Sequence, residues 1–148
     1  MKGNVVQFVF ILLSLVVGAA LEDVLPAIGP VGFPILLGMS LFFATTTRSP
    51  VWILSAVSAG ALEEAIASLP LATAIVFFAA AALAARFFRE PVLWAAVLYP
   101  AYQVWLGIIT GGSGAFGRVI VSVPAGAVVM VLLYAALSRI WRKAGADA

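Results

Sequence analysis

The sequence contains no cysteine and no histidine, and only 9% of its residues are charged. Without these residue types the chain has no thiol nucleophile, no disulfide, no imidazole base and few of the usual zinc ligands. It also has no long polar segment, so a soluble catalytic domain of at least about 50 residues does not fit beside the apolar segments. These absences argue against an enzyme, and we expect no cofactor and no bound metal.

Apolar side chains are in excess: 65% of the 148 residues are hydrophobic, and the mean hydropathy is +1.21. Soluble proteins are roughly half apolar and about a quarter charged. Six apolar stretches approach the length of about 20 residues that a membrane span requires. They cover residues 5–20, 31–47, 51–69, 71–86, 92–110 and 119–138. We therefore predict an all-α integral membrane protein, with residues 1–148 forming one bundle of about six transmembrane helices.

Two prolines, Pro100 and Pro124, fall inside the fifth and sixth stretches rather than at their ends. Proline has no N–H group, and its ring clashes with the preceding turn of a helix. We expect both helices to be kinked there, with the freed carbonyl groups bonded by neighbouring helices.

The placement of lysine and arginine predicts the orientation, because short cytoplasmic loops carry an excess of these residues. With a cytoplasmic N-terminus, six spans put only Arg118 on the outer side. The inner side then holds Lys2, Arg48, Arg86, Arg89, Arg139, Arg142 and Lys143. We expect both termini in the cytoplasm, with Trp141 at the membrane interface and the basic tail on anionic lipid. Alternatively, the first stretch is a signal peptide cleaved near Gly18-Ala19-Ala20.

Two adjacent acids, Glu63 and Glu64, interrupt the third apolar stretch. Helical spacing puts Gly60 and Glu64 on one line of small residues, and such lines let helices approach closely in lipid. Ionisable residues inside a membrane are costly and commonly functional. Glu63, Glu64, Gly60 and Arg118 are therefore candidates for a partner-docking or ion site.

Two further acids, Glu22 and Asp23, end the first stretch on the same outer side. That side then has four carboxylates and one cation, Arg118, which is the imbalance behind the site hypothesis. We expect Glu22 and Asp23 to be solvated at the end of their span. The alternative for the other two acids is that they are protonated or paired with Arg118.

Aromatic and polar residues gather around Pro100 in the segment "PVLWAAVLYPAYQVWLG". Its members Tyr99, Tyr102, Gln103 and Trp105 are candidates for a ligand pocket, because polar groups inside a membrane bundle tend to pair or to bind something. The alternative is that they form hydrogen bonds between helices and anchors at the interface.

Two other motifs have simpler explanations. The segment "GSGAFG" at 112–117 matches the G-x-G-x-x-G sequence of dinucleotide-binding motifs, but it lacks the preceding strand and the later acid that such a motif requires. The segment "TTTRSP" at 45–50 suggests phosphate binding, yet a span end with a topology-setting arginine explains it. The basic residues are spread thinly along the membrane ends, so no nucleic-acid partner is expected.

The segment "RSPVWILSAVSAGALEEAIASLPLATAIVFF" and the residues after it resemble the MreD family of bacterial rod-shape-determining membrane proteins. A helix of that family has the approximate pattern G-x-x-x-D/E-x-x-x-G/S-x-P-L-G. In this sequence Gly60, Glu64, Ser68 and the pair Pro70-Leu71 follow the pattern, with glutamate for the commoner aspartate and Ala72 for the final glycine. The likeness covers about residues 30–143 and includes the last helix, "SVPAGAVVMVLLYAALSRIWRK".

The resemblance implies a non-catalytic scaffold of the bacterial inner membrane that acts in cell elongation, cell shape and peptidoglycan synthesis. Its implied partners are an MreC-like protein, a RodA-like protein and a penicillin-binding protein, besides membrane lipids. A second hypothesis is the substrate-binding membrane subunit of an energy-coupling-factor (ECF) transporter for a small solute, with the cluster around Pro100 as its pocket. A third is an accessory subunit of another membrane complex.

Overall fold

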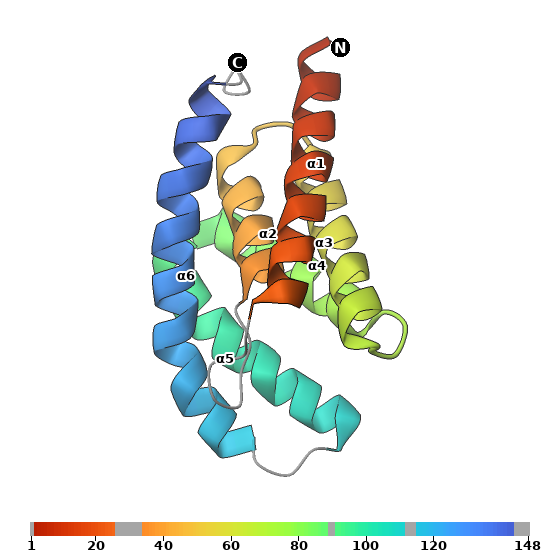
Figure 1. Ribbon diagram of the computed structural model, residues 1–148, viewed down its shortest axis with the longest axis vertical. Coiled ribbons are helices and arrows are strands. Elements are labelled where there is room, and N and C mark those ends of the chain that lie inside the picture. Colours follow the sequence, from red (N-terminus) through yellow and green to blue (C-terminus); the bar gives the residue numbers. More distant parts are fainter. Residues whose placement is uncertain (1, 26–33, 89–90, 112–114, 144–148) are drawn as a thin grey trace.

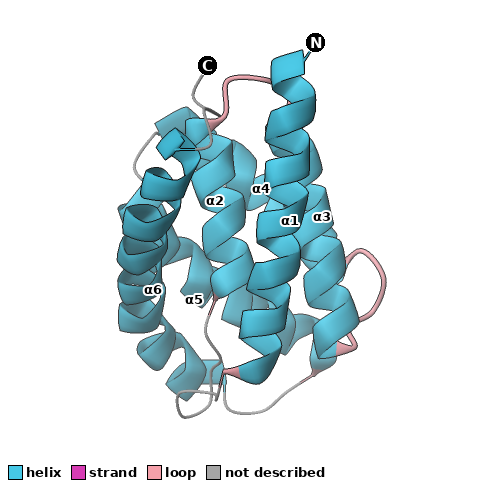
Figure 2. Ribbon diagram, turned by 45° about the horizontal axis from the view of Figure 1, so that its top comes forward, coloured by secondary structure: helices cyan, strands magenta, loops and turns pink. Residues whose placement is uncertain are grey.

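The computed structural model describes residues 2–25, 34–88, 91–111 and 115–143, and within these ranges it is entirely helical (Figure 2). The helices are α1 (Lys2–Val24), α2 (Ile35–Thr46), α3 (Val51–Ala67), α4 (Thr73–Phe88), α5 (Pro91–Thr110) and α6 (Ala115–Lys143). This order confirms the predicted helices, whose ends differ by a few residues, most of all in the longer α6.

Among the described residues, two helices are long and apolar enough to cross a membrane, namely Gly3–Val24 within α1 and Val119–Lys143 within α6. Shorter apolar helices are Ile35–Thr46, Thr73–Phe88 and Ala96–Thr110. The 12 residues of α2 rise about 18 Å, which is less than the hydrocarbon thickness of about 30 Å. The prediction that α2 is a transmembrane span is therefore incomplete, because this helix is much shorter than the thickness of the membrane core.

The short helix α2 lies at the centre of the molecule and contacts each of the other five helices (Figure 1). All of its residues from 35 to 44 are buried. A helix that is apolar on every side is stable only when other elements surround it, and here five helices do. The sequence "ILLGMSLFFA" supplies this all-round apolar surface.

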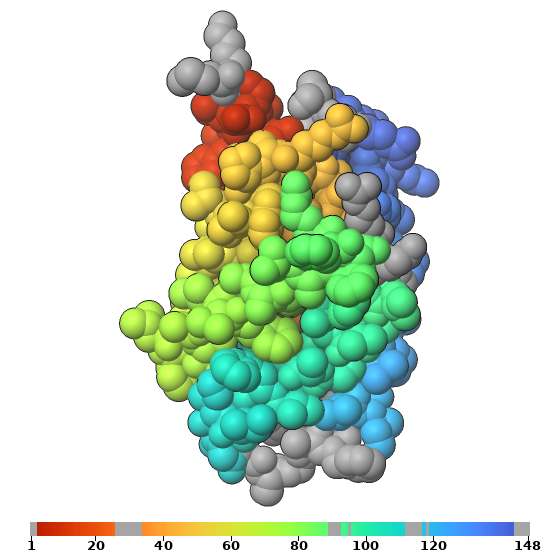
Figure 3. All heavy atoms as spheres, turned by 180° about the vertical axis from the view of Figure 1, so that it is seen from behind, coloured from red at the N-terminus to blue at the C-terminus, as the bar shows by residue number. Residues whose placement is uncertain are grey.

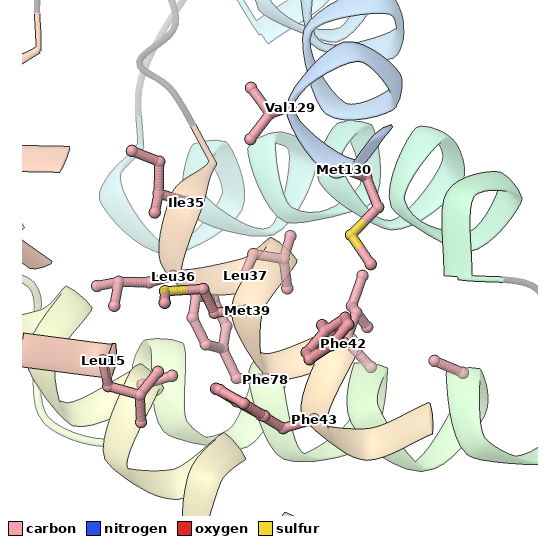
Figure 4. Close-up of a cluster of buried hydrophobic side chains, with 14 of the residues drawn as sticks. Leu15, Ile35, Leu36, Leu37, Met39, Phe42, Phe43, Phe78, Val129 and Met130 are labelled. Carbon is pink, nitrogen blue, oxygen red and sulfur yellow. The ribbon is translucent and has the colours of Figure 1, made fainter. Parts of the chain in front are cut away.

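The main core forms where side chains of α1, α4 and α6 meet those of α2. Figure 4 shows Leu15, Phe78 and Met130 among the buried side chains of α2, such as Phe42 and Phe43. All five have exposed fractions of 1% or less, so this core is closely packed.

Trp141 belongs to this core rather than to a membrane interface. Its side chain is 1% exposed, and its ring meets Phe10 edge-on at 5.2 Å and Phe43 at 5.6 Å. The predicted role of Trp141 as an anchor at the membrane interface is wrong, because its indole packs between Phe10 of α1 and the phenylalanines of α2.

The outer surface also carries large apolar side chains. On α1, Leu13, Val16 and Val17 are 64%, 58% and 58% exposed, and on α6 Leu132 is 64% exposed. The same two helices bury residues on their inner faces, so they are apolar on both sides. An apolar surface of this extent is unfavourable in water and calls for an apolar surrounding or a partner.

α1 begins and α6 ends at the same end of the molecule (Figures 1 and 2). Viewed from behind, α4 and α5 run obliquely across the molecule, with α3 beside them (Figure 3). Both α5 and α6 continue through their internal prolines, Pro100 and Pro124. Kinks at these positions stay a prediction.

Candidate functional site

The Glu64 carboxylate binds the first turn of the following helix. Its Oε1 accepts the backbone N–H groups of Ala74 at 2.9 Å and Ile75 at 3.0 Å, and its Oε2 accepts that of Ala72 at 3.1 Å. The first N–H groups of a helix have no partner inside the helix, and a negative charge there is favourable. Glu64, 7% exposed, therefore caps α4 from the neighbouring helix α3.

The turn between α3 and α4 places the Glu64 carboxylate beside the first N–H groups of α4. Ser68 ends α3 in the left-handed conformation, with φ 51°, and its N–H donates to the carbonyl of Glu64. The N–H of Leu69 bonds the same carbonyl at 3.0 Å. Ala72 is also left-handed, with φ 67°. Two left-handed residues within five positions turn the chain back sharply, so α4 begins beside the last turn of α3.

Gly60 lies one helical turn before Glu64 and permits the close approach of α4. A Cβ atom at Gly60 would lie 2.6 Å from the Cα of Ile75 and 2.8 Å from its nitrogen, which are backbone atoms that cannot rotate away. Ala56, one turn earlier, is fully buried. The line of small residues on α3 thus faces another helix, as its spacing predicts.

Glu63 points to a different part of the bundle from Glu64. The Tyr102 hydroxyl of α5 donates to Oε1 of Glu63 at 3.3 Å. The Glu63 carboxyl group also lies close to that of Glu22 on α1. Glu63 thus joins α1, α3 and α5.

Glu22 is not solvated at the end of its span, so that expectation is wrong. Its Oε2 accepts the backbone N–H of Leu36 at 2.8 Å. Glu22 therefore caps the N-terminus of α2 from α1, as Glu64 caps α4 from α3. Asp23, by contrast, is exposed, as expected.

The side chain of Arg86 binds the C-terminal end of α2, opposite the end that Glu22 caps. Nη1 of Arg86 donates to the carbonyl oxygens of Ala44 at 3.0 Å and Thr47 at 2.8 Å. A positive charge is favourable at a helix C-terminus, where carbonyl groups lack partners. Sequence reasoning gave Arg86 only a role in topology. Its partners lie 42 and 39 positions away, so no local pattern reveals them.

The aromatic cluster predicted around Pro100 faces the acids. Tyr99, Tyr102 and Gln103 are buried, and Tyr99 is hydrogen-bonded to Gln103. Trp105 donates from Nε1 to the carbonyl of Thr73 at 3.0 Å, next to the α4 turn that Glu64 caps. The structure therefore brings the tyrosines and the glutamine of this cluster together with Glu63 and Glu22 in one polar region, which we call the inner polar cluster: Glu22, Glu63, Tyr99, Tyr102 and Gln103.

Arg118, the cation proposed to pair with the acids, lies in α6, and its side chain is outside the described part of the structure. The observed partners of Glu64 are backbone N–H groups, and Glu63 accepts the Tyr102 hydroxyl. A docking or ion-binding role for these acids stays a prediction. What their geometry can do directly is fix the contacts among α1, α2, α3, α4 and α5.

Comparisons with known proteins give no relative from which a role can be transferred. No protein-family model matches the chain, and no curated protein or solved structure is significantly similar to it. The functional argument therefore depends on the contacts described above.

Proposed function

We propose that the protein is a non-catalytic scaffold, an accessory subunit of a larger assembly in a bacterial inner membrane. Two helices with membrane-spanning length and composition, α1 and α6, support the membrane location. The exposed apolar residues of these helices, such as Leu13 and Leu132, suit a lipid or protein surrounding. In this proposal all six helices are embedded in the membrane, and both termini face the cytoplasm.

The observation that carries the scaffold role is the use of the buried acids. Glu64 accepts three backbone N–H groups, and Glu22 accepts that of Leu36. A carboxylate that is filled by backbone donors has little capacity left for a substrate. The carboxyl groups at these places therefore serve architecture, which favours a rigid docking body over a transport or catalytic site.

The MreD-like pattern gains a physical explanation from the same contacts. Gly60 permits close packing, Glu64 caps the next helix, and Ser68 adopts a left-handed conformation at the end of α3. Ala72 stands where the pattern has glycine, and its φ of 67° is one that glycine adopts most readily. These four roles support an MreD-like assignment, with MreC-like, RodA-like and penicillin-binding proteins as proposed partners.

Affinity purification tests this proposal. The tagged full chain is cross-linked in its native membrane, purified in mild detergent and analysed by mass spectrometry. We expect recovery of cell-elongation proteins of the kinds named above, well above the level obtained with an unrelated tagged membrane protein of similar size. Recovery of an ATPase pair with a transporter coupling subunit instead would contradict the scaffold role.

The inner polar cluster favours one second candidate, the substrate-binding subunit of an ECF-type transporter. Buried tyrosines, a glutamine and a carboxylic acid together resemble the few polar groups that orient a small ligand. A ligand that binds only the native state stabilises it, by about 2.7 kcal/mol at 100 times its Kd. Saturable stabilisation by one vitamin or cation, lost in Tyr102→Phe, would support this candidate. Thermal stability that no such solute changes would leave the scaffold role in place.

A further inference from the structure

A cleft of about 910 Å³ opens beside the C-terminal end of α2, far in sequence from the acids. We call it the arginine cleft. Its polar wall comes from the last turn of α2, the segment after it and α4, and its apolar wall comes from the last turns of α4. The residues used below are Thr46, Thr47, Arg48 and Arg86 on the polar wall and Leu83 and Phe87 on the apolar wall. Its volume lies in the range of small-molecule sites, which is about 300–1,000 Å³.

The charge of the cleft suits an anion. Two guanidinium groups, Arg48 and Arg86, line it, and none of its described lining residues is acidic. Arg86 is held in place by its two Nη1 bonds and by the Trp52 ring, whose centroid lies 5.2 Å from the guanidinium carbon. Those bonds use Nη1, so Nε and Nη2 remain as donors. A fixed, planar guanidinium is the group best suited to bind two oxygens of a phosphate.

Two hydroxyl groups at the cleft add hydrogen-bonding capacity. Oγ1 of Thr46 and Oγ1 of Thr47 are buried and have no hydrogen-bond partner among the described residues, and Thr47 is only 2% exposed. Thr45 differs, because its hydroxyl donates to carbonyl oxygens of its own helix at 3.0 Å. Buried hydroxyls without partners are uncommon. Oxygen atoms of a bound phosphate would accept from them after small rotations of the side chains.

The apolar wall indicates what the phosphate is attached to. Leu83 is 50% exposed and Phe87 is 80% exposed, so an apolar surface leads away from the two arginines along α4. We propose that the arginine cleft binds a phosphate group carried on an apolar chain, as in the headgroup region of an anionic phospholipid. This inference rests on the proposed membrane location, in which the cleft lies at the cytoplasmic interface.

Lipid titration tests the inference, with the full chain purified in non-ionic detergent and binding followed by native mass spectrometry. The probes are a short-chain phosphatidic acid, the matching diacylglycerol without phosphate, and glycerol 3-phosphate without the apolar chains. We expect phosphatidic acid to bind at least about tenfold more tightly than either of the others, because each lacks one half of the recognised group.

Two variants and a control locate the binding. Arg48→Gln should weaken phosphatidic acid binding by about tenfold, and Thr46→Val by about threefold or more, since each removes a donor to the phosphate. Arg139→Gln makes the same charge change at an exposed position of α6 outside the cleft and should alter binding less than about twofold. Neither cleft variant removes the Arg86 bonds, so folding should be retained.

Each other outcome has a defined meaning. Equal losses in Arg48→Gln and Arg139→Gln would overturn the site, because binding would then follow net charge alone. Glycerol 3-phosphate binding as tightly as phosphatidic acid would overturn the lipid source and assign a soluble phosphate ester. If the cleft variants lose lipid binding but still recover the membrane partners, the cleft is not needed for the scaffold role. If the unmodified protein binds lipid normally but recovers no membrane partner, only the scaffold role is contradicted.

Discussion

The carboxylate of Glu64 lies 2.9 Å from the backbone nitrogen of Ala74, so a side chain of α3 completes the first turn of α4. Glu22 of α1 makes the corresponding bond to Leu36 of α2 at 2.8 Å. In both cases the carboxyl group of an acid near the end of one helix accepts hydrogen bonds from the first backbone N–H groups of the next helix. Charged residues in an apolar chain thus determine how successive helices join.

Replacing Glu64 by glutamine should lower the free energy of unfolding by about 1.5–3 kcal/mol. The amide NH2 cannot accept a hydrogen bond, so at least one N–H group among Ala72, Ala74 and Ile75 loses its partner. Thermal denaturation in detergent measures the change. Asp23→Asn is the matched control, because Asp23 is exposed and its replacement should alter stability by less than about 0.5 kcal/mol. Equal effects in the two variants would contradict the capping role.

Gly60→Ala should lower the free energy of unfolding by about 1–3 kcal/mol, because α3 and α4 must separate to admit a methyl group 2.6 Å from a backbone atom. Gly117→Ala is the control. A Cβ at Gly117 meets nothing within 4 Å, and alanine favours a helix by up to about 1 kcal/mol over glycine. A Gly60→Ala protein as stable as the Gly117→Ala protein would show that the helices do not meet so closely.

Ala72→Gly should raise the free energy of unfolding by about 1 kcal/mol, since an L-residue with a left-handed backbone costs roughly 1–2 kcal/mol and glycine avoids most of this cost. Ala61→Gly, on the exposed side of α3, should have the opposite effect, with a loss of about 0.5–1 kcal/mol. Both are measured by thermal denaturation. A loss of stability in both variants would mean that Ala72 is not left-handed.

Single cysteines should report the orientation without further engineering, because the natural sequence has none. Asp23→Cys and Arg139→Cys both replace exposed residues, near the end of α1 and in the last turns of α6. In intact cells whose outer membrane has been made permeable, an impermeant maleimide should label Cys at position 23 and spare position 139. Labelling of position 139 alone would reverse the proposed orientation.

The helices were predictable because proline, glycine and charged residues interrupt a sequence that is otherwise apolar. The approach of α3 to another helix was also predictable, because Gly60 and Glu64 lie one turn apart. The central position of α2 was not. All six stretches are strongly apolar, so hydropathy alone does not distinguish a helix enclosed by five others from one that faces its surroundings.

The partners of the charged residues could be predicted only in part. Glu63 and the tyrosine cluster were both singled out, but their contact joins residues 39 positions apart. The contacts of Glu22 and Arg86 were not predicted, because a residue beside a span end has an adequate local explanation in solvation or topology. Trp141 shows the same limit, since a tryptophan beside basic residues is typical of an interface and here fills a core.

The two helix caps have a consequence for biogenesis. Glu22 and Glu64 are synthesised before the helices whose first N–H groups they accept, by 14 residues for Leu36 and 10 for Ala74. Each acid is therefore already part of its own helix when the helix that it caps is translated. The two capping bonds can form in the order of translation, before α5 and α6 are made, whereas the complete burial of α2 still requires contacts with those later helices.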